Sequence, residues 1–222
     1  MRITPLLVSI GIVAAPLAMS GAQTVDATID RAVAAWEKVK SVRGSFEQTV
    51  SNSLTGTSVT SKGSYVQERP NRLAIRFAKP MTDAIVADGN VVWVYLPSST
   101  PGQVFKRPAT DRTAVPIDLT GQFLDAPRAK YDITPAGART VDGRASKALI
   151  LVPKKSTNAP FTKATVWIGD DDFLIREFEL AEASGITRRI KLTSIETNAP
   201  VSRSEFTFAI PAGVKVVDQS KN

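Results

Sequence analysis

The chain has 222 residues, contains neither cysteine nor histidine, and carries a net charge of +7 from 28 Lys and Arg against 21 Asp and Glu. The two missing residue types supply the usual general base, the thiolate nucleophile and most zinc ligands, so those chemistries are excluded. The basic residues are scattered as on a solvated surface, and we expect a binding protein without catalytic residues, metal, cofactor or nucleic-acid partner.

The N-terminal segment is typical of a secretory signal peptide. Arg2 precedes an uncharged apolar run at residues 6–18, and small residues follow at 20–22. A retained membrane anchor is the alternative, but the run is shorter than the roughly 20 residues that a spanning helix needs. We expect residues 1–22 to be cleaved and residues 23–222 to form one exported, soluble domain. No cysteine stands at the cleavage site to carry a lipid anchor.

The next segment, residues 25–39, is predicted to be an amphipathic helix. Its apolar residues recur at helical spacing and are Ile29, Val33, Trp36 and Val39. A helix with one apolar face has to pack against another element, which the rest of the chain must provide.

From residue 44 onward the apolar residues alternate with polar ones, which indicates β-strands. The Asp88-Gly89 pair between two such runs is a strong hairpin signal. We predict ten or eleven short strands, over residues 45–50, 59–68, 73–77, 84–87, 91–96, 103–107, 131–134, 145–153, 164–168, 174–180 and 187–195. The chain then closes with residues 205–208 and an apolar tail through Val214 and Val217.

One stretch, residues 110–126, interrupts the alternation. Its apolar residues are irregularly spaced around Pro116 and Gly121, which favours one or two short helices. The predicted fold is therefore mainly β, with a single curved antiparallel sheet wrapped around helices. Such helices can fill the hollow of the sheet or merely cover it and leave an apolar cavity. The sequence does not decide between these two arrangements.

Several motifs, in this order and spacing, carry a resemblance to a known family. They are Phe46-Glu47-Gln48-Thr49, Gly63, Arg69-Pro70-Asn71-Arg72-Leu73, Lys79-Pro80, Ile85-Val86-Ala87-Asp88-Gly89, Val92-Trp93-Val94-Tyr95 and Phe206-Thr207-Phe208. Together they resemble the periplasmic outer-membrane lipoprotein carrier family (LolA-type) over nearly all of residues 23–222.

This resemblance implies an unclosed antiparallel β-barrel of about eleven strands, with an N-terminal helix and short lid helices over an apolar cavity. It also implies a monomeric periplasmic chaperone that shields the acyl chains of lipid-modified proteins. The expected partners are the lipoproteins themselves, an inner-membrane lipoprotein-releasing ABC transporter and an outer-membrane lipoprotein acceptor.

The resemblance assigns roles to individual residues as well. Arg69 matches an arginine that holds the lid shut, and the lid corresponds to residues 110–126. The side chains expected to line the acyl-chain cavity are Val33, Trp36, Leu73, Ile75, Phe77, Ile85, Ile117, Leu119 and Phe123.

Each of these residues has a plainer interpretation. Alternating apolar residues usually form a filled core, and an arginine before a proline is usually a surface turn residue. The acidic run 170–172 lacks the spaced ligands of a calcium site and is typical of a solvated turn. Leu54 and Met81 stand at predicted turn tips, where an exposed apolar side chain is a candidate contact with a partner or a membrane.

Other functions remain open on the residues alone. A periplasmic lipid- or lipoprotein-sensing module with the same half-barrel is the main alternative. A β-barrel enzyme would need paired carboxylates or an activated Ser or Lys in the cavity, and no such motif stands out. A structural envelope protein with a filled core is a further possibility.

Overall fold

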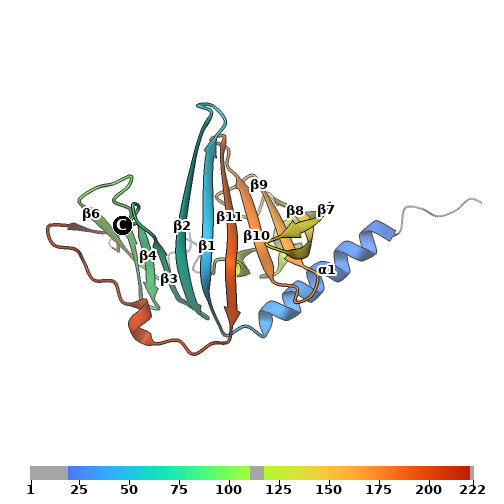
Figure 1. Cartoon of the computed structure of the whole chain (residues 1–222), viewed down its shortest axis with the longest axis horizontal. Helices are drawn as coiled ribbons and strands as arrows, with labels where there is room; N and C mark the ends of the chain where they lie inside the picture. The colour runs from blue at the N-terminus through green and yellow to red at the C-terminus, as the bar shows by residue number, and fades with distance from the viewer. Residues whose placement is uncertain (1–19, 111–117, 221–222) are drawn as a thin grey trace, which may run out of the picture.

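The computed structural model describes residues 20–110 and 118–220, in which one long helix lies against one large curved sheet (Figure 1). The helices are α1 (Ser20–Glu37), η1 (Gly121–Phe123), α2 (Pro127–Lys130) and η2 (Arg203–Phe206). The strands are β1 (Ser41–Asn52), β2 (Thr57–Glu68), β3 (Arg72–Phe77), β4 (Ala84–Asp88), β5 (Val91–Tyr95), β6 (Gln103–Pro108), β7 (Tyr131–Val141), β8 (Arg144–Pro153), β9 (Lys163–Gly169), β10 (Ile175–Ala181), β11 (Ile186–Thr197) and β12 (Lys215–Asp218). Ile117 and most of the expected signal peptide lie outside the described residues.

All twelve described strands belong to one sheet in the order β12-β6-β5-β4-β3-β2-β1-β11-β10-β9-β8-β7. Neighbouring strands are antiparallel except β12, which runs parallel to β6. The two end strands, β7 and β12, do not pair with each other, so the sheet curves without closing into a barrel. This confirms the predicted unclosed β-barrel, with one strand more than the eleven expected because the apolar tail forms β12.

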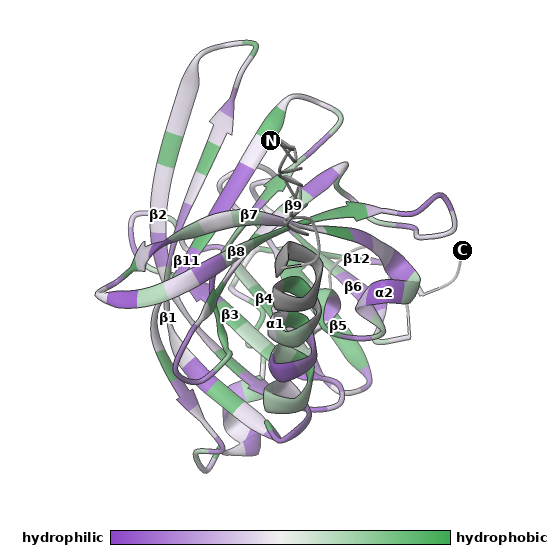
Figure 2. Ribbon diagram, turned by 90° about the vertical axis from the view of Figure 1, so that its right-hand side faces the viewer, coloured by the Kyte–Doolittle hydropathy of each residue, from purple (hydrophilic) through white to green (hydrophobic). Residues whose placement is uncertain are grey.

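Helix α1 lies in the hollow of the sheet (Figure 2). Ile29, Ala32 and Trp36 are buried at helical spacing, which is the apolar face that the sequence predicts. The helix ends two residues before the predicted end, and β1 begins after a three-residue connection. None of the helices in the described ranges is long and apolar enough to cross a membrane.

The two faces of the sheet carry two separate apolar clusters. On β3, Leu73 and Ile75 point into the hollow and join the main cluster, whereas Ala74 between them joins a smaller cluster on the outer face. The outer cluster is covered by Phe206 from η2, and Phe208 stacks against Trp93 with ring centroids 5.8 Å apart. The C-terminal stretch therefore packs on the outside of the sheet and leaves the hollow to α1.

Two glycines allow aromatic rings to lie across neighbouring strands at the centre of the sheet. In the β1–β2 register Gly44 faces Tyr65, and Phe46 faces Gly63. A Cβ at Gly63 would stand 2.5 Å from the carbonyl oxygen of Arg76 and 2.6 Å from Cζ of Phe46. Because a backbone atom is one of the two neighbours, the site cannot relax by moving a side chain alone.

Replacing Gly63 by alanine should therefore destabilise the fold. We expect Gly63→Ala to lower the free energy of unfolding by about 1–3 kcal/mol, the usual cost of overpacking, as measured by chemical denaturation. The matched control is Ser64→Ala at the next, exposed position of β2, which should stay within about 0.5 kcal/mol of wild type. Equal stability of the two variants would contradict the close packing.

Candidate functional site

The hollow of the sheet brings together the side chains expected to line a cavity. Five of them, Trp36, Leu73, Ile75, Leu119 and Phe123, are buried members of the main apolar cluster. Three more pack against this cluster while partly exposed, namely Val33, Phe77 and Ile85. Among the nine expected lining residues, only Ile117 falls outside the described part of the chain. The structure thus gathers the other eight on one apolar surface, and their contact with a ligand stays a prediction.

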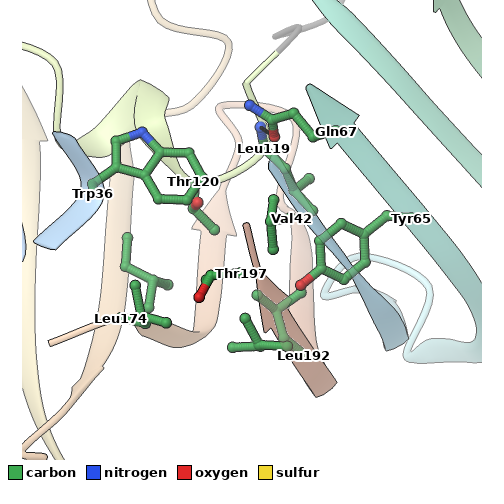
Figure 3. A pocket seen from close by; sticks show the side chains of 11 residues that line it. Trp36, Val42, Tyr65, Gln67, Leu119, Thr120, Leu174, Leu192 and Thr197 are labelled. Carbon is green, nitrogen blue, oxygen red and sulfur yellow. Dashed lines mark hydrogen bonds between the residues drawn. The ribbon is translucent and has the colours of Figure 1, made fainter. Parts of the chain in front are cut away.

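The hollow of the sheet holds a small cavity beside α1. A cavity of about 10 Å³ remains between α1, β1, β2, β11 and the loop before η1, which is barely room for one water molecule. Figure 3 shows the side chains around it, among them Trp36, Tyr65, Gln67 and Leu119. This cavity is too small for an acyl chain, so a chain bound at this place would require one of the surrounding segments to move.

Residues 118–126 of the expected lid pack into the hollow beside α1. Phe123 is fully buried, and Leu119 and Leu124 are nearly so. The Phe123 ring lies 5.1 Å from the ring of Phe178 on β10, measured between centroids. We call residues 118–126 the plug, because their apolar side chains Leu119, Phe123 and Leu124 are buried in the hollow.

Two interior side chains hold the start of the plug by hydrogen bonds. The Leu119 backbone N–H donates to Oε1 of Gln67 over 3.4 Å, and Nε1 of Trp36 donates to Oδ2 of Asp118 over 3.3 Å. Gly121 lies so close to this pair that an added Cβ would clash with both Asp118 and Trp36. The plug is therefore fitted tightly against α1 and β2 by two polar contacts.

Gln67 and Asp118 were not singled out from the sequence. A signal for Gln67 was present, since it shares the inward face of β2 with Tyr65 and so breaks an apolar pattern. Asp118 offered no comparable signal, because its partner Trp36 is 82 residues away in the chain.

Arg69 lies at the end of α1 rather than on the plug. Its guanidinium donates to the carbonyl oxygens of Trp36 and Val39 over 3.0 and 3.3 Å. The same group lies 5.6 Å from the centre of the Trp36 ring, a cation–π distance. Among the described residues Arg69 therefore reaches the plug only through Trp36, and its role in holding the lid stays a prediction.

The polar side chains that line the small cavity are uncharged. Tyr65 donates from its hydroxyl to the carbonyl oxygen of Ser194 over 3.4 Å, and burial raises the pKa of this hydroxyl above its ordinary value. Gln67 and Thr120 are the other buried polar side chains at the cavity. Glu177, which is also buried, instead pairs with Arg139 over 2.5 Å. The cavity is thus lined by apolar groups and a few uncharged polar ones.

The two expected contact residues differ in exposure. Leu54 is 83% exposed at the tip of the β1–β2 hairpin, which projects beyond the rest of the sheet (Figure 1). Met81 is only half-exposed in the β3–β4 loop. A contact of either side chain with a membrane or a partner protein stays a prediction.

The acidic run 170–172 is engaged by basic side chains. Asp171 pairs with Arg144 over 2.5 Å, Asp172 pairs with Arg176, and Asp170 lies 3.5 Å from Lys147. Within the described ranges no group of three or more acidic side chains is placed to hold a metal ion.

Comparisons with known proteins agree with this geometry. The family model described as "Outer membrane lipoprotein carrier protein LolA" matches residues 37–209. A protein named outer-membrane lipoprotein carrier protein from Leptothrix cholodnii is 29% identical over 183 residues, covering 82% of each chain. A protein of the same name from Methylibium petroleiphilum is 29% identical over 202 residues, covering 90% of this chain and 93% of the relative.

A solved structure with the same fold extends the comparison. An uncharacterised conserved protein from Thermus thermophilus aligns with a TM-score of 0.56 at 12% identity, covering 89% of this chain and 100% of that one. At this identity the likeness concerns the fold alone. Because the family model covers more than half of the residues, the chain belongs to the outer-membrane lipoprotein carrier family, LolA.

Proposed function

We infer that the chain is a periplasmic chaperone that binds the acyl chains of lipoproteins and carries them to the outer membrane. Its family membership and an apolar hollow closed by a small plug support this function together. The plug is the observation that carries the proposal, because three of its apolar side chains, Leu119, Phe123 and Leu124, occupy the hollow in place of a ligand.

The energetics of acyl chains make such a carrier necessary. Moving one CH₂ group of an acyl chain from an apolar environment into water costs a free energy of roughly 0.8 kcal/mol. Several long chains therefore cannot cross an aqueous space unshielded. An apolar hollow shields them without directional bonds, since burial of apolar surface does not depend on orientation. The plug can then be exchanged for the chains, because both bury the same inner face of the sheet.

The partners follow from this cycle as proposals. An inner-membrane lipoprotein-releasing ABC transporter would deliver the lipoprotein to the carrier, and an outer-membrane acceptor would receive it. The chain has more Lys and Arg than Asp and Glu, so electrostatic complementarity would strengthen its binding to partners with acidic contact surfaces. We propose that the carrier works as a monomer.

A lipid- or lipoprotein-sensing module is not favoured. The two relatives described above carry the name of a carrier, and their alignments extend over 82% and 93% of their own lengths. The proposal requires no covalent step, and the lining of the hollow holds uncharged groups rather than paired carboxylates.

Release from membranes tests the function directly. When the protein is mixed with spheroplasts or with the reconstituted transporter, a lipoprotein should appear in a complex that stays in the supernatant. Ile85→Asp places a carboxylate on the inner face and should abolish this complex, because burying an unpaired charge is costly. Ser64→Asp, at an exposed position of β2, is the control and should leave release unchanged. Absence of any lipoprotein complex with the wild-type protein would contradict the function.

Weakening the end of α1 should shift the protein away from the closed state. Arg69→Leu removes the bonds to the carbonyl oxygens of Trp36 and Val39. The Trp36 carbonyl still accepts a bond from the Val39 N–H, so the fold should persist. Trp36→Phe keeps an aromatic ring but removes the indole N–H that bonds Asp118, together with part of the ring. Each variant should hold cargo longer and slow its transfer to an acceptor by about three- to tenfold, the equivalent of one hydrogen bond.

The matched control for these two variants is Arg72→Leu. Arg72 pairs with Glu68. Within the described residues it forms no hydrogen bond or ion pair with α1. Circular dichroism would verify that all three variants are folded. Wild-type transfer by both Arg69→Leu and Trp36→Phe would rule out the path from Arg69 through Trp36 to the plug.

A further inference from the structure

Gln67 is a polar side chain on the apolar inner face of the sheet. Its neighbours across the strands are Val42 on β1 and Leu73 on β3, and both belong to the main apolar cluster. The side chain is only 2% exposed, so its amide is shielded from bulk water. Burying an amide in such a place is costly unless a hydrogen-bond partner is present.

In the closed state the plug supplies this partner. The Leu119 N–H donates to Oε1 of Gln67 over 3.4 Å, which is the one hydrogen bond of this side chain among the described residues. Figure 3 shows the amide of Gln67 directed toward Leu119, beside the small cavity. Displacement of the plug breaks this bond, and the amide is then left facing whatever enters the hollow.

Hydrocarbon alone cannot satisfy Gln67 after the plug has moved. The acyl chains of a lipoprotein, however, are joined to its terminal cysteine by ester and amide groups, which carry carbonyl oxygens and an N–H. A glutamine amide both donates and accepts hydrogen bonds, so it can pair with either linkage. Thr197 lines the same cavity from β11 and adds a hydroxyl that does not leave with the plug.

We propose that Gln67 is a specificity-determining residue that binds an ester linkage of the acyl anchor once the plug has moved away. This inference rests on the proposed carrier function and adds to it a preference among ligands. Gln67 exchanges one partner for another: the Leu119 N–H in the closed state and the linkage in the loaded state. An acylated anchor is thereby distinguished from a plain hydrocarbon of equal length.

The test compares two synthetic lipopeptides that differ only in the linkage. One carries two chains as esters on an S-glyceryl cysteine, and the other carries chains of the same length as ethers, which lack the carbonyl oxygens. Titration calorimetry with the wild-type protein should give about tenfold tighter binding of the ester probe, the equivalent of one hydrogen bond. Gln67→Met keeps the length of the side chain and should bring the two affinities within about twofold of each other.

Gln48→Met is the matched control. Gln48 is also buried, on the neighbouring strand β1, and within the described residues it forms no hydrogen bond with the plug. This variant should keep the tenfold preference. Equal affinity of the wild-type protein for both probes would overturn the inference while leaving the carrier function intact, and this result needs no variant to fold. Failure of the wild-type protein to bind either probe would overturn the carrier function and the inference with it.

Discussion

The apolar inner face of an unclosed sheet has to be covered, and the rest of the structure depends on this constraint. A closed barrel of the same strands would bury its lining by itself, but here β7 and β12 do not pair. Helix α1 covers one part of the hollow, and the plug covers another part beside it. The plug includes a helix of only three residues, η1, so its removal would sacrifice little regular structure.

The closing of the hollow combines two kinds of interaction with different consequences. Burial of Leu119, Phe123 and Leu124 provides most of the stabilisation, and an acyl chain can replace it in kind because the hydrophobic effect is not directional. The hydrogen bonds from Trp36 and to Gln67 are directional and fix where the plug lies. A carrier needs both the apolar burial and the hydrogen bonds. It has to stay closed when empty, and a ligand of similar apolar surface still has to be able to displace the plug.

Much of the fold follows from local patterns in the sequence. Alternation placed Leu73, Ile75 and Phe77 on one face of β3, and helical spacing placed Trp36 on the inner face of α1, as the structure has them. The parallel pairing of β12 with β6 could not be predicted, because it joins segments more than 100 residues apart without a hairpin between them. The contacts of the plug with Gln67 and Trp36 are equally non-local, and no periodicity reports them.

The displacement of the plug is the central claim, and a distance measurement tests it most directly. The chain has no cysteine, so Ser64→Cys on the outer side of β2 and Asp125→Cys on the plug would be the two attachment sites for spin labels. Pulsed electron paramagnetic resonance should give one distance for the empty protein. A longer distance should appear and dominate when an ester-linked lipopeptide is bound. An unchanged single distance in the fully loaded protein would show that cargo is bound without moving the plug, and would contradict this account.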